Sequence, residues 1–423
     1  MHDDTMPIPR IKAEPEKPTG HGHGHGHGHG HGHGPAEPAS KKVRRLLTAL
    51  LLPFALASVA GVILLYPFGG TPSPKVGQQE PVSGDVTAVS QGSCEDGVQV
   101  GSADGPCLLI SVKMSDGAAS GKEITTRAPI EPSSPRFAVG DKVVMAYSGA
   151  DATNGDSYKV VDFQRGMPLA VLAGLFALAI LVLGRYQGVA ALIALGLSFV
   201  VLLMFVLPAI LAGESPLLVA VAGAGLIMFV ALYLTHGLSA RTSTAVLGTM
   251  ISLVLIGGLG ALFSALTKLT GLDEDTGLLL GTLGQSLDTR GLLLAGLIIG
   301  ALGVLDDVTV TQASVVWELR RANPLLSWRE LYAAGLRIGR DHVSSAVNTL
   351  AMAYAGAALP ILLYSYLSDA GLGTILGSQS IAQEIVRTLV GSIGLIACVP
   401  VTTLVAALVA SREPAIPATS RTS

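Results

Sequence analysis

Two consecutive acidic residues end a long apolar run. Asp306 and Asp307 follow residues 291–305, which carry no charge. A carboxylate at bilayer depth costs a few kcal/mol even on lenient scales, so such groups normally face a bundle interior or a wet cavity. Helical spacing adds three polar residues to the face of Asp307: Thr311, Ser314 and Glu318. This stripe predicts a proton or cation path, unless the apolar segment ends before the aspartates and leaves them solvated.

A second polar stripe lies in the next apolar segment. Asp341, Ser345 and Asn348 share one helical face at spacings i, i+4 and i+7. Both stripes come close to the same membrane surface, so adjacent helices could bring Asp307 and Asp341 together. The alternative interpretation is packing, because Ser and Asn commonly hydrogen-bond between helices in membrane bundles.

A run of alternating His and Gly near the N-terminus supplies seven imidazoles. Neutral imidazole binds Zn, Ni or Cu, so weak binding of a divalent metal is chemically reasonable. A repeat without fixed geometry selects no particular metal, which favours a neutral low-complexity expansion over a metal buffer. The histidines are His21, His23, His25, His27, His29, His31 and His33.

Three cysteines are present. Cys94 and Cys107 share one polar segment, and a disulfide between them is expected if that segment lies outside the cytoplasm. Two free thiols are the alternative. The sequence contains no Walker loop, serine nucleophile elbow or His-Glu-x-x-His motif, so neither an enzyme nor a cofactor is expected.

The composition indicates that lipid solvates much of this chain. Of its 423 residues, 50% are hydrophobic and only 13% are charged, whereas soluble domains carry about 25% charged residues. No basic face suggests nucleic-acid binding. The expected fold is therefore an α-helical membrane bundle of about eight transmembrane helices, with the lipid bilayer as its main partner.

The order of polar and apolar segments predicts five regions. They are a disordered cytoplasmic tail (1–45), a transmembrane helix (46–68), an extracytoplasmic β-domain (69–165), a seven-helix transmembrane bundle (166–411) and a second cytoplasmic tail (412–423). A cleaved signal peptide is the competing interpretation of residues 46–68, but the long polar segment before them favours an anchor. The seven later spans are expected near 167–184, 188–212, 216–235, 243–266, 291–311, 343–367 and 384–410.

Alternating segments separated by Gly, Asp and Ser predict the β-domain, an antiparallel barrel or sandwich for which an OB-like barrel is one candidate form. The predicted strands lie near 82–86, 108–114, 142–147 and 158–162. Such a domain could bind an extracytoplasmic protein partner.

Charges in the loops predict the orientation. Basic residues fall on one side of the predicted spans and Asp273, Glu274, Asp275 and Asp369 on the other, which places both termini in the cytoplasm. The basic residues are Lys41, Lys42, Arg44, Arg45, Arg185, Arg241, Arg320, Arg321, Arg329, Arg337, Arg340 and Arg412. A capping box from Ser327 to Glu330 begins a helix near 325–340, expected to lie on the cytoplasmic leaflet or to act as a plain connector.

Several short motifs carry a family resemblance. They are Gly300-Ala-Leu-Gly303 leading to Asp307-Val308, Asn323-Pro324, Gly339-Arg340-Asp341, residues 348–354, Leu359-Pro360, Leu207-Pro208 and Gly248-Thr249. Over residues 67–410 the chain resembles the YibE/F-like family of bacterial multi-pass membrane proteins. The resemblance implies a fold and a location in the bacterial plasma membrane, but no activity. The chain departs from the usual motif at Asp306 and Gln312, whose positions are apolar in its typical form.

Three functional hypotheses follow. The first is a permease or ion-coupled transporter, with Asp307 and Asp341 as proton or cation sites and Thr311 and Asn348 as neutral ligands. The second is a non-transporting scaffold or assembly factor whose β-domain binds a partner. The third is divalent-metal transport with the histidine run as a buffer.

Overall fold

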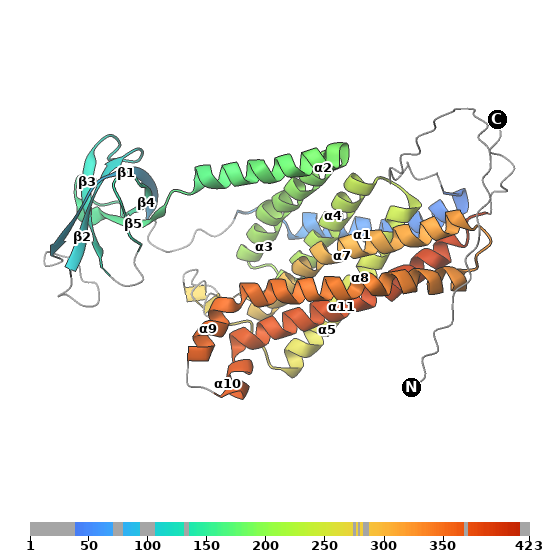
Figure 1. Cartoon of the computed structure of the whole chain (residues 1–423). Coiled ribbons are helices and arrows are strands. Elements are labelled where there is room, and N and C mark those ends of the chain that lie inside the picture. The colour runs from blue at the N-terminus through green and yellow to red at the C-terminus, as the bar shows by residue number, and fades with distance from the viewer. Residues whose placement is uncertain are drawn as a thin grey trace, which may run out of the picture. The chain divides into compact units, whose positions relative to one another are not determined.

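The computed structural model describes residues 39–70, 79–93, 106–130, 135–273, 276–277, 280–281, 287–367 and 371–414. These residues form one long helix, then a β-sheet and then a set of further helices along the chain (Figure 1). The histidine run, Cys94, Glu274, Asp275 and Asp369, all named in the sequence analysis, lie outside them.

The sheet has five antiparallel strands: β1 (Glu80–Ser93), β2 (Pro106–Met114), β3 (Glu123–Pro129), β4 (Lys142–Tyr147) and β5 (Tyr158–Phe163). Their order is β3-β2-β1-β4-β5. Strand β1 is long enough to pair with β4 through residues 80–85 and with β2 through residues 84–93, and a bulge between Val86 and Ala88 interrupts the second pairing. The result is a half-barrel, with the first strand between the second and fourth as in OB-like barrels.

Alternation of apolar and polar residues gives the half-barrel its core. Val82, Ile110, Val112, Val143 and Met145 are completely or almost completely buried on its inner side. The Thr126 hydroxyl of β3 donates to the Tyr158 carbonyl of β5 at 2.6 Å. This hydrogen bond joins the two outer strands of the sheet. The four predicted strands are confirmed, and β3, which the prediction missed, completes the sheet.

The β4–β5 loop is ordered by an acidic residue. The Asp151 carboxylate accepts hydrogen bonds from the backbone N–H and hydroxyl of Thr153, at 2.8 and 2.7 Å. These bonds hold the pKa of Asp151 below its usual value. In β2, Cys107 is disulfide-bonded; its predicted partner Cys94 lies outside the described residues, so the pairing itself stays a prediction.

The long helices are α1 (Lys41–Leu65), α2 (Gly166–Val201), α4 (Pro216–His236), α5 (Ala240–Leu266), α7 (Thr289–Ala322), α8 (Trp328–Ala357) and α11 (Gln379–Ala410). The shorter ones are α3 (Leu207–Leu211), α9 (Leu359–Leu367) and α10 (Leu372–Leu376), and a π-helical turn, Leu202–Val206, joins α2 to α3. Among the described residues, six helices are long and apolar enough to cross a membrane, and the bent pair of α8 and α9 is a seventh candidate.

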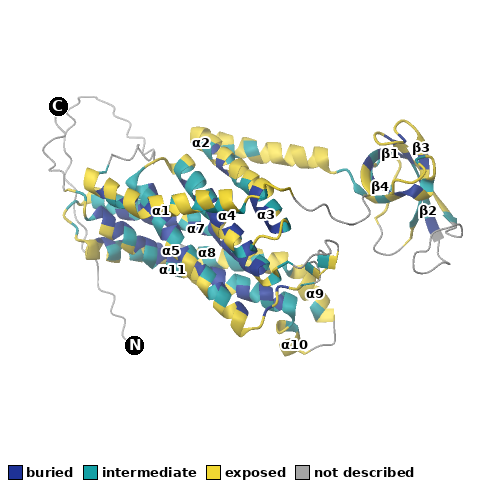
Figure 2. Ribbon diagram, turned by 180° about the vertical axis from the view of Figure 1, so that it is seen from behind, coloured by how far each residue is buried: buried dark blue, intermediate teal, exposed yellow. Residues whose placement is uncertain are grey.

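Helix α2 is broken at Arg185, as the spans predicted on either side of it require. This residue has φ 48° and ψ −124°, which no α-helix contains. The chain folds back there, since a Cβ on Gly188 would lie 2.5 Å from the Ile180 carbonyl oxygen. Figure 2 shows the run before the break almost entirely exposed.

The predicted surface helix near 325–340 is not separate from the following span. The Ser327–Glu330 capping box is confirmed, but the helix that it starts continues without interruption to Ala357. Leu331 is fully buried in a cluster with Val316 and Ala406, so this helix packs on α7 and α11 instead of ending. The break comes later, where Pro360 has no N–H to continue the helix and α9 turns away by 57°.

Buried residues concentrate where α5, α7 and α11 meet, with α4 and α8 on either side of α7 (Figure 2). The predicted basic residues at helix ends meet at one end of this bundle, called here the basic end. There Arg241 pairs with Glu318 at 3.8 Å, and Arg320 donates to the Glu413 carbonyl at 2.9 Å. The Glu413 carboxylate in turn accepts from the backbone N–H of Ser40, which caps α1.

Candidate functional site

The interior of the bundle contains a ladder of buried polar side chains. Helix α5 contributes Thr244, Thr249 and Ser252, α7 contributes Thr309 and Gln312, and α11 contributes Cys398, Thr402 and Thr403. All eight are at most 3% exposed. Because they come from three helices that pack together, they form a polar seam inside an otherwise apolar core, and we call this set the polar ladder.

Hydrogen bonds connect the polar ladder across helices. The hydroxyls of Thr249 and Thr309 are 2.8 Å apart, and the Thr309 hydroxyl also lies 3.2 Å from the Asp306 carbonyl. The Gln312 amide donates to the Gly335 carbonyl of α8 at 2.8 Å and to the Thr403 hydroxyl at 2.7 Å. Four helices are therefore joined through two side chains of α7.

Small residues permit this close approach. A Cβ on Gly339 would lie 2.6 Å from both the Gln312 side-chain oxygen and Val399, and a Cβ on Gly248 would lie 2.4 Å from the Thr402 hydroxyl. Toward the basic end, the Trp317 indole N–H donates to Thr244 at 3.3 Å. The polar ladder thus runs from the middle of α5 and α7 to the basic end.

Asp306 lies at the other end of the polar ladder. Its Oδ1 atom is buried and has no hydrogen-bond partner among the described residues. The contacts between Thr249 and Thr309, and between Gly248 and Thr402, place Asp306 level with Ser252 and Cys398. Electrostatic interaction between Asp306 and the Cys398 thiol agrees with that placement. The hydroxyl of Ser252 is also buried without a hydrogen-bond partner.

The predicted stripe on α7 lies on a different face of the helix. Asp307, Thr311 and Glu318 are exposed and Ser314 is half-buried. They share one face, as their spacing predicts, but this face points out of the bundle. The inward face carries Asp306, Thr309 and Gln312, which lie about 100°, 160° and 140° around the helix from Asp307.

The predicted stripe on α8 is exposed as well. Asp341, Ser345 and Asn348 all lie on the uncovered side of that helix. Asp307 and Asp341 therefore do not converge on an internal cavity of the single chain. Asp307 lies instead within electrostatic range of His236 at the end of α4. Each stripe shares one face, as predicted, but neither face points into the interior formed by the described helices.

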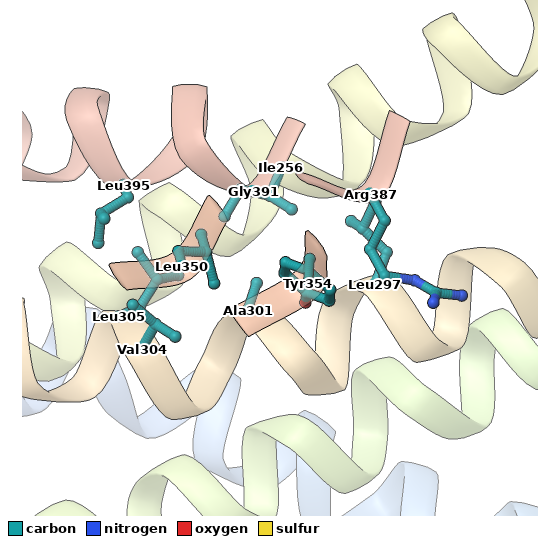
Figure 3. A pocket seen from close by; sticks show the side chains of 10 residues that line it. All are labelled: Ile256, Leu297, Ala301, Val304, Leu305, Leu350, Tyr354, Arg387, Gly391 and Leu395. Carbon is teal, nitrogen blue, oxygen red and sulfur yellow. The ribbon is translucent and has the colours of Figure 1, made fainter. Parts of the chain in front are cut away.

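A small cavity separates Asp306 from a second charged site. It lies between α5, α7, α8 and α11, with a volume of about 10 Å³, about the minimum for one water. Figure 3 shows Tyr354 and Arg387 toward one end and Val304, Leu305, Leu350 and Leu395 toward the other. Apart from Tyr354 and Arg387 the lining is apolar, so a water inside would find few hydrogen-bond partners, and we call this cavity the dry gap.

The second charged site lies on α11. Arg387 and Glu384 form an ion pair at 2.5 Å with about a quarter of each side chain exposed, and Arg387 Nε is buried without a hydrogen-bond partner. Glu384 and Tyr354 also line an apolar groove of about 230 Å³ between α8, α9 and α11. The ion pair thus stands between an outer groove and the small cavity.

Sequence reasoning missed most members of this arrangement. Gln312 was noted only as a polar departure from a family motif, and the threonines of α5 and α11 gave no signal because Thr is common in apolar helices. The spacing of Cys398 and Thr402 at i, i+4 was available but weak. Among the described residues no group of three or more His, Cys, Asp or Glu could hold a metal ion, and the histidine run lies outside them.

Comparison with known proteins gives one match. The family model described as YibE/F-like protein matches residues 172–412, which include all helices from α4 to α11 and most of α2. No curated protein and no solved structure matches the chain.

Proposed function

The chain belongs to the YibE/F-like family, and from that premise we propose that it is a membrane permease or ion-coupled transporter in which Asp306 binds a proton or cation. Membership of this family and the apolar helices fit a membrane protein. The step from a membrane protein to a transporter rests on the buried Asp306 oxygen, which has no hydrogen-bond partner among the described residues. Ionisable groups inside membrane bundles are costly to bury, and they commonly mark ion and proton pathways.

The polar ladder supports a route from Asp306 to the basic end. Hydroxyl and amide groups can each donate and accept a hydrogen bond, so the pairs Thr249–Thr309 and Gln312–Thr403 can replace part of the water around a small cation or hydronium ion on its way to the basic end. Asp306 and Gln312 lie at the two positions where this chain departs from the typical family motif, so this route is proposed for this chain in particular.

The dry gap supports a closed state. The pair Glu384–Arg387 and Asp306 stand on either side of an apolar cavity too small for more than about one water. An apolar constriction between two polar sites blocks ion movement until it widens and wets. Transport would therefore require α8 or α11 to move, and the break before α9 provides a place for that movement.

Proton flux in proteoliposomes tests the role of Asp306. The full chain is reconstituted with an internal pH-sensitive dye, and a potassium diffusion potential drives proton entry. We expect Asp306→Asn to lower the protein-dependent rate by about tenfold or more. The neighbouring substitution Asp307→Asn makes the same chemical change on the exposed face and is expected to leave the rate close to that of the wild type.

Two outcomes contradict the proposal. One is a wild-type rate equal to that of protein-free vesicles, and the other is full activity of Asp306→Asn. Loss of activity in Asp307→Asn alone would instead favour a path along the exposed face of α7.

The proposed topology has eight spans, counted by dividing α2–α3 at Arg185 and joining α8 to α9. The basic end faces the cytoplasm of a bacterium, with both termini on that side, and the half-barrel lies outside the plasma membrane. No catalytic activity or cofactor is proposed. Reporter fusions after Phe163 and Arg412 test this topology, because they should report opposite sides of the membrane.

A membrane scaffold or assembly factor is the second candidate. The tight apolar packing around the small cavity favours it, because a scaffold needs no internal path. Its prediction is a stable protein partner that crosslinks through residues 79–163, together with a silent Asp306→Asn substitution. Divalent-metal transport is weaker, and unchanged metal tolerance after deletion of residues 21–34 would count against it.

A further inference from the structure

One face of α8 carries polar residues from Arg337 to Thr349 and has no covering element among the described residues. It consists of exposed residues on two adjacent ridges of the helix, and we call it the polar face of α8. Its members are Arg337, Arg340, Asp341, Ser344, Ser345, Asn348, Thr349, Met352, Ala353 and Gly356. The rest of α8 packs on α7 and α11.

The hydrogen-bonding groups of this face are unused. Neither Asp341 nor the two arginines forms an ion pair with a described residue, and the Asn348 amide forms no hydrogen bond with one. The Thr349 hydroxyl donates to the Ser345 carbonyl within the same helix, at 2.9 Å. An amide, an acid and two cations are therefore left without a partner among the described residues.

Lipid does not suit this face. Helices α8 and α9 together qualify as a candidate membrane span, and the polar residues from Asp341 to Thr349 extend over about 12 Å of the helix, a substantial part of the hydrocarbon thickness. Polar side chains at this depth normally face protein or a wet cavity. The neighbouring helix α11 presents Leu389, Ile393 and Ile396 to its exposed side, so the polar face of α8 is an exception on this part of the surface.

The chemistry of the face complements itself. Arg337 and Arg340 stand within about one helical turn of Asp341, so each aspartate can form an ion pair with an arginine of the second copy. An amide both donates and accepts, so Asn348 can pair with a second Asn348. Small residues on the same ridges, Ser344, Ser345 and Gly356 among them, permit the close helix approach that drives association in membranes.

We propose that a second copy of this chain packs on the polar face of α8, with the two α8 helices parallel about a two-fold axis along the membrane normal. All copies insert in the same direction, so α8 meets α8 in parallel and each residue faces its own equivalent or one a turn away. Asp341 of one copy then reaches the arginines of the other near the basic end, and the Asn348 side chains meet deeper in the bilayer.

The α7 stripe lies beside this interface. Helices α7 and α8 are antiparallel neighbours, with Gln312 beside Gly335 and Gly300 beside the Tyr354 hydroxyl. This register places Asp307 level with Ser344. A second copy on α8 therefore also reduces the exposure of Asp307 to lipid. It explains why the two polar stripes, which resemble interior faces, lie on the outside of the single chain.

Cysteine crosslinking of the full chain in native membranes tests the proposal. Asn348→Cys places a thiol on the predicted axis and should give a disulfide-linked homodimer on oxidation. Leu389→Cys places one on the exposed apolar surface of α11 and should not. The unsubstituted chain controls for its own cysteines, of which Cys398 is buried.

Native mass spectrometry in detergent supplies the independent readout. The unsubstituted chain should appear as a dimer, and Asn348→Leu should weaken dimerisation by about tenfold, as loss of an interhelical amide bond implies. Equal crosslinking of both cysteine variants, a monomer at all concentrations, or an adduct of Asn348→Cys with a different protein would each overturn the proposal. A folded Asn348→Cys chain that crosslinks supports it even if Asn348→Leu does not fold.

Discussion

At the scale of single residues, the position of a polar group within a turn of helix decides what it can do. Asp306 and Asp307 are adjacent in sequence, but one has a buried oxygen and the other is exposed. A rotation of about 100° per residue is sufficient for this difference. Chemical type alone therefore does not identify the acid inside the bundle, because both residues have the same side chain.

Gln312 gives a test at this scale. Gln312→Leu removes the two hydrogen bonds to α8 and α11 while keeping most of the side-chain volume. We expect a loss of about 1–3 kcal/mol in the free energy of unfolding, because the Thr403 hydroxyl loses a buried partner. Thermal denaturation of the purified chain in detergent measures it.

The matched control is Thr311→Val, which changes a polar group one residue away on the exposed face. It should leave the denaturation temperature nearly unchanged. An equal fall in denaturation temperature in both variants would contradict the role of Gln312 as a link between α7, α8 and α11.

At the scale of elements, glycines determine how closely the helices of the bundle approach. Gly339 and Gly303 are both inside long helices, where glycine costs about 0.5–1 kcal/mol relative to alanine. A Cβ placed on Gly339 would overlap neighbouring atoms, whereas a Cβ placed on Gly303 would have no atom within 4 Å. The close contact of α8 with α7 and α11 therefore depends on the first glycine and not on the second.

Opposite effects are expected for alanine at the two positions. Gly339→Ala should destabilise the chain, by about 1–3 kcal/mol, because the added methyl overlaps Gln312 and Val399. Gly303→Ala should be neutral or stabilising by up to about 1 kcal/mol through helix propensity. Denaturation temperatures of the two variants in the same detergent measure the difference, and a reversed order would refute the packing of α8 described above.

At the scale of the whole bundle, residues far apart in sequence hold its basic end together. The two oxygens of the Glu413 carboxylate accept hydrogen bonds from the Ser40 N–H at 2.9 and 3.0 Å. Arg320 donates hydrogen bonds to the backbone carbonyls of both Glu413 and Leu326. The first helix, the α7–α8 connection and the end of α11 are thereby connected. These bonds are formed by groups that sequence spacing does not relate.

Removal of this connection should loosen the end of α11. Glu413→Ala is expected to increase the rate of tryptic cleavage after Arg412 by about fivefold, because local opening becomes cheaper by about 1 kcal/mol. Mass spectrometry of the digest of the full chain follows that cleavage. Glu318→Ala, which removes an exposed ion pair at the same end, should leave the rate unchanged, and equal acceleration in both variants would assign the effect to surface charge alone.

The sequence by itself determined the apolar helices, most of the strands and the segregation of basic residues to one end. These features are local or depend on the strong difference between lipid and water as solvents. The capping box at Ser327 and the break at Arg185 were also readable from neighbouring residues.

Only the tertiary structure decided which face of each helix is buried. A helix in lipid can be apolar on every side, so the periodicity that marks the inner face of a soluble helix is absent. For that reason the polar ladder of threonines was not visible in the sequence, and neither was the choice between Asp306 and Asp307 as the inward acid. The choice depends on contacts among α5, α7, α8 and α11, which are set by side-chain shape over distances of many residues.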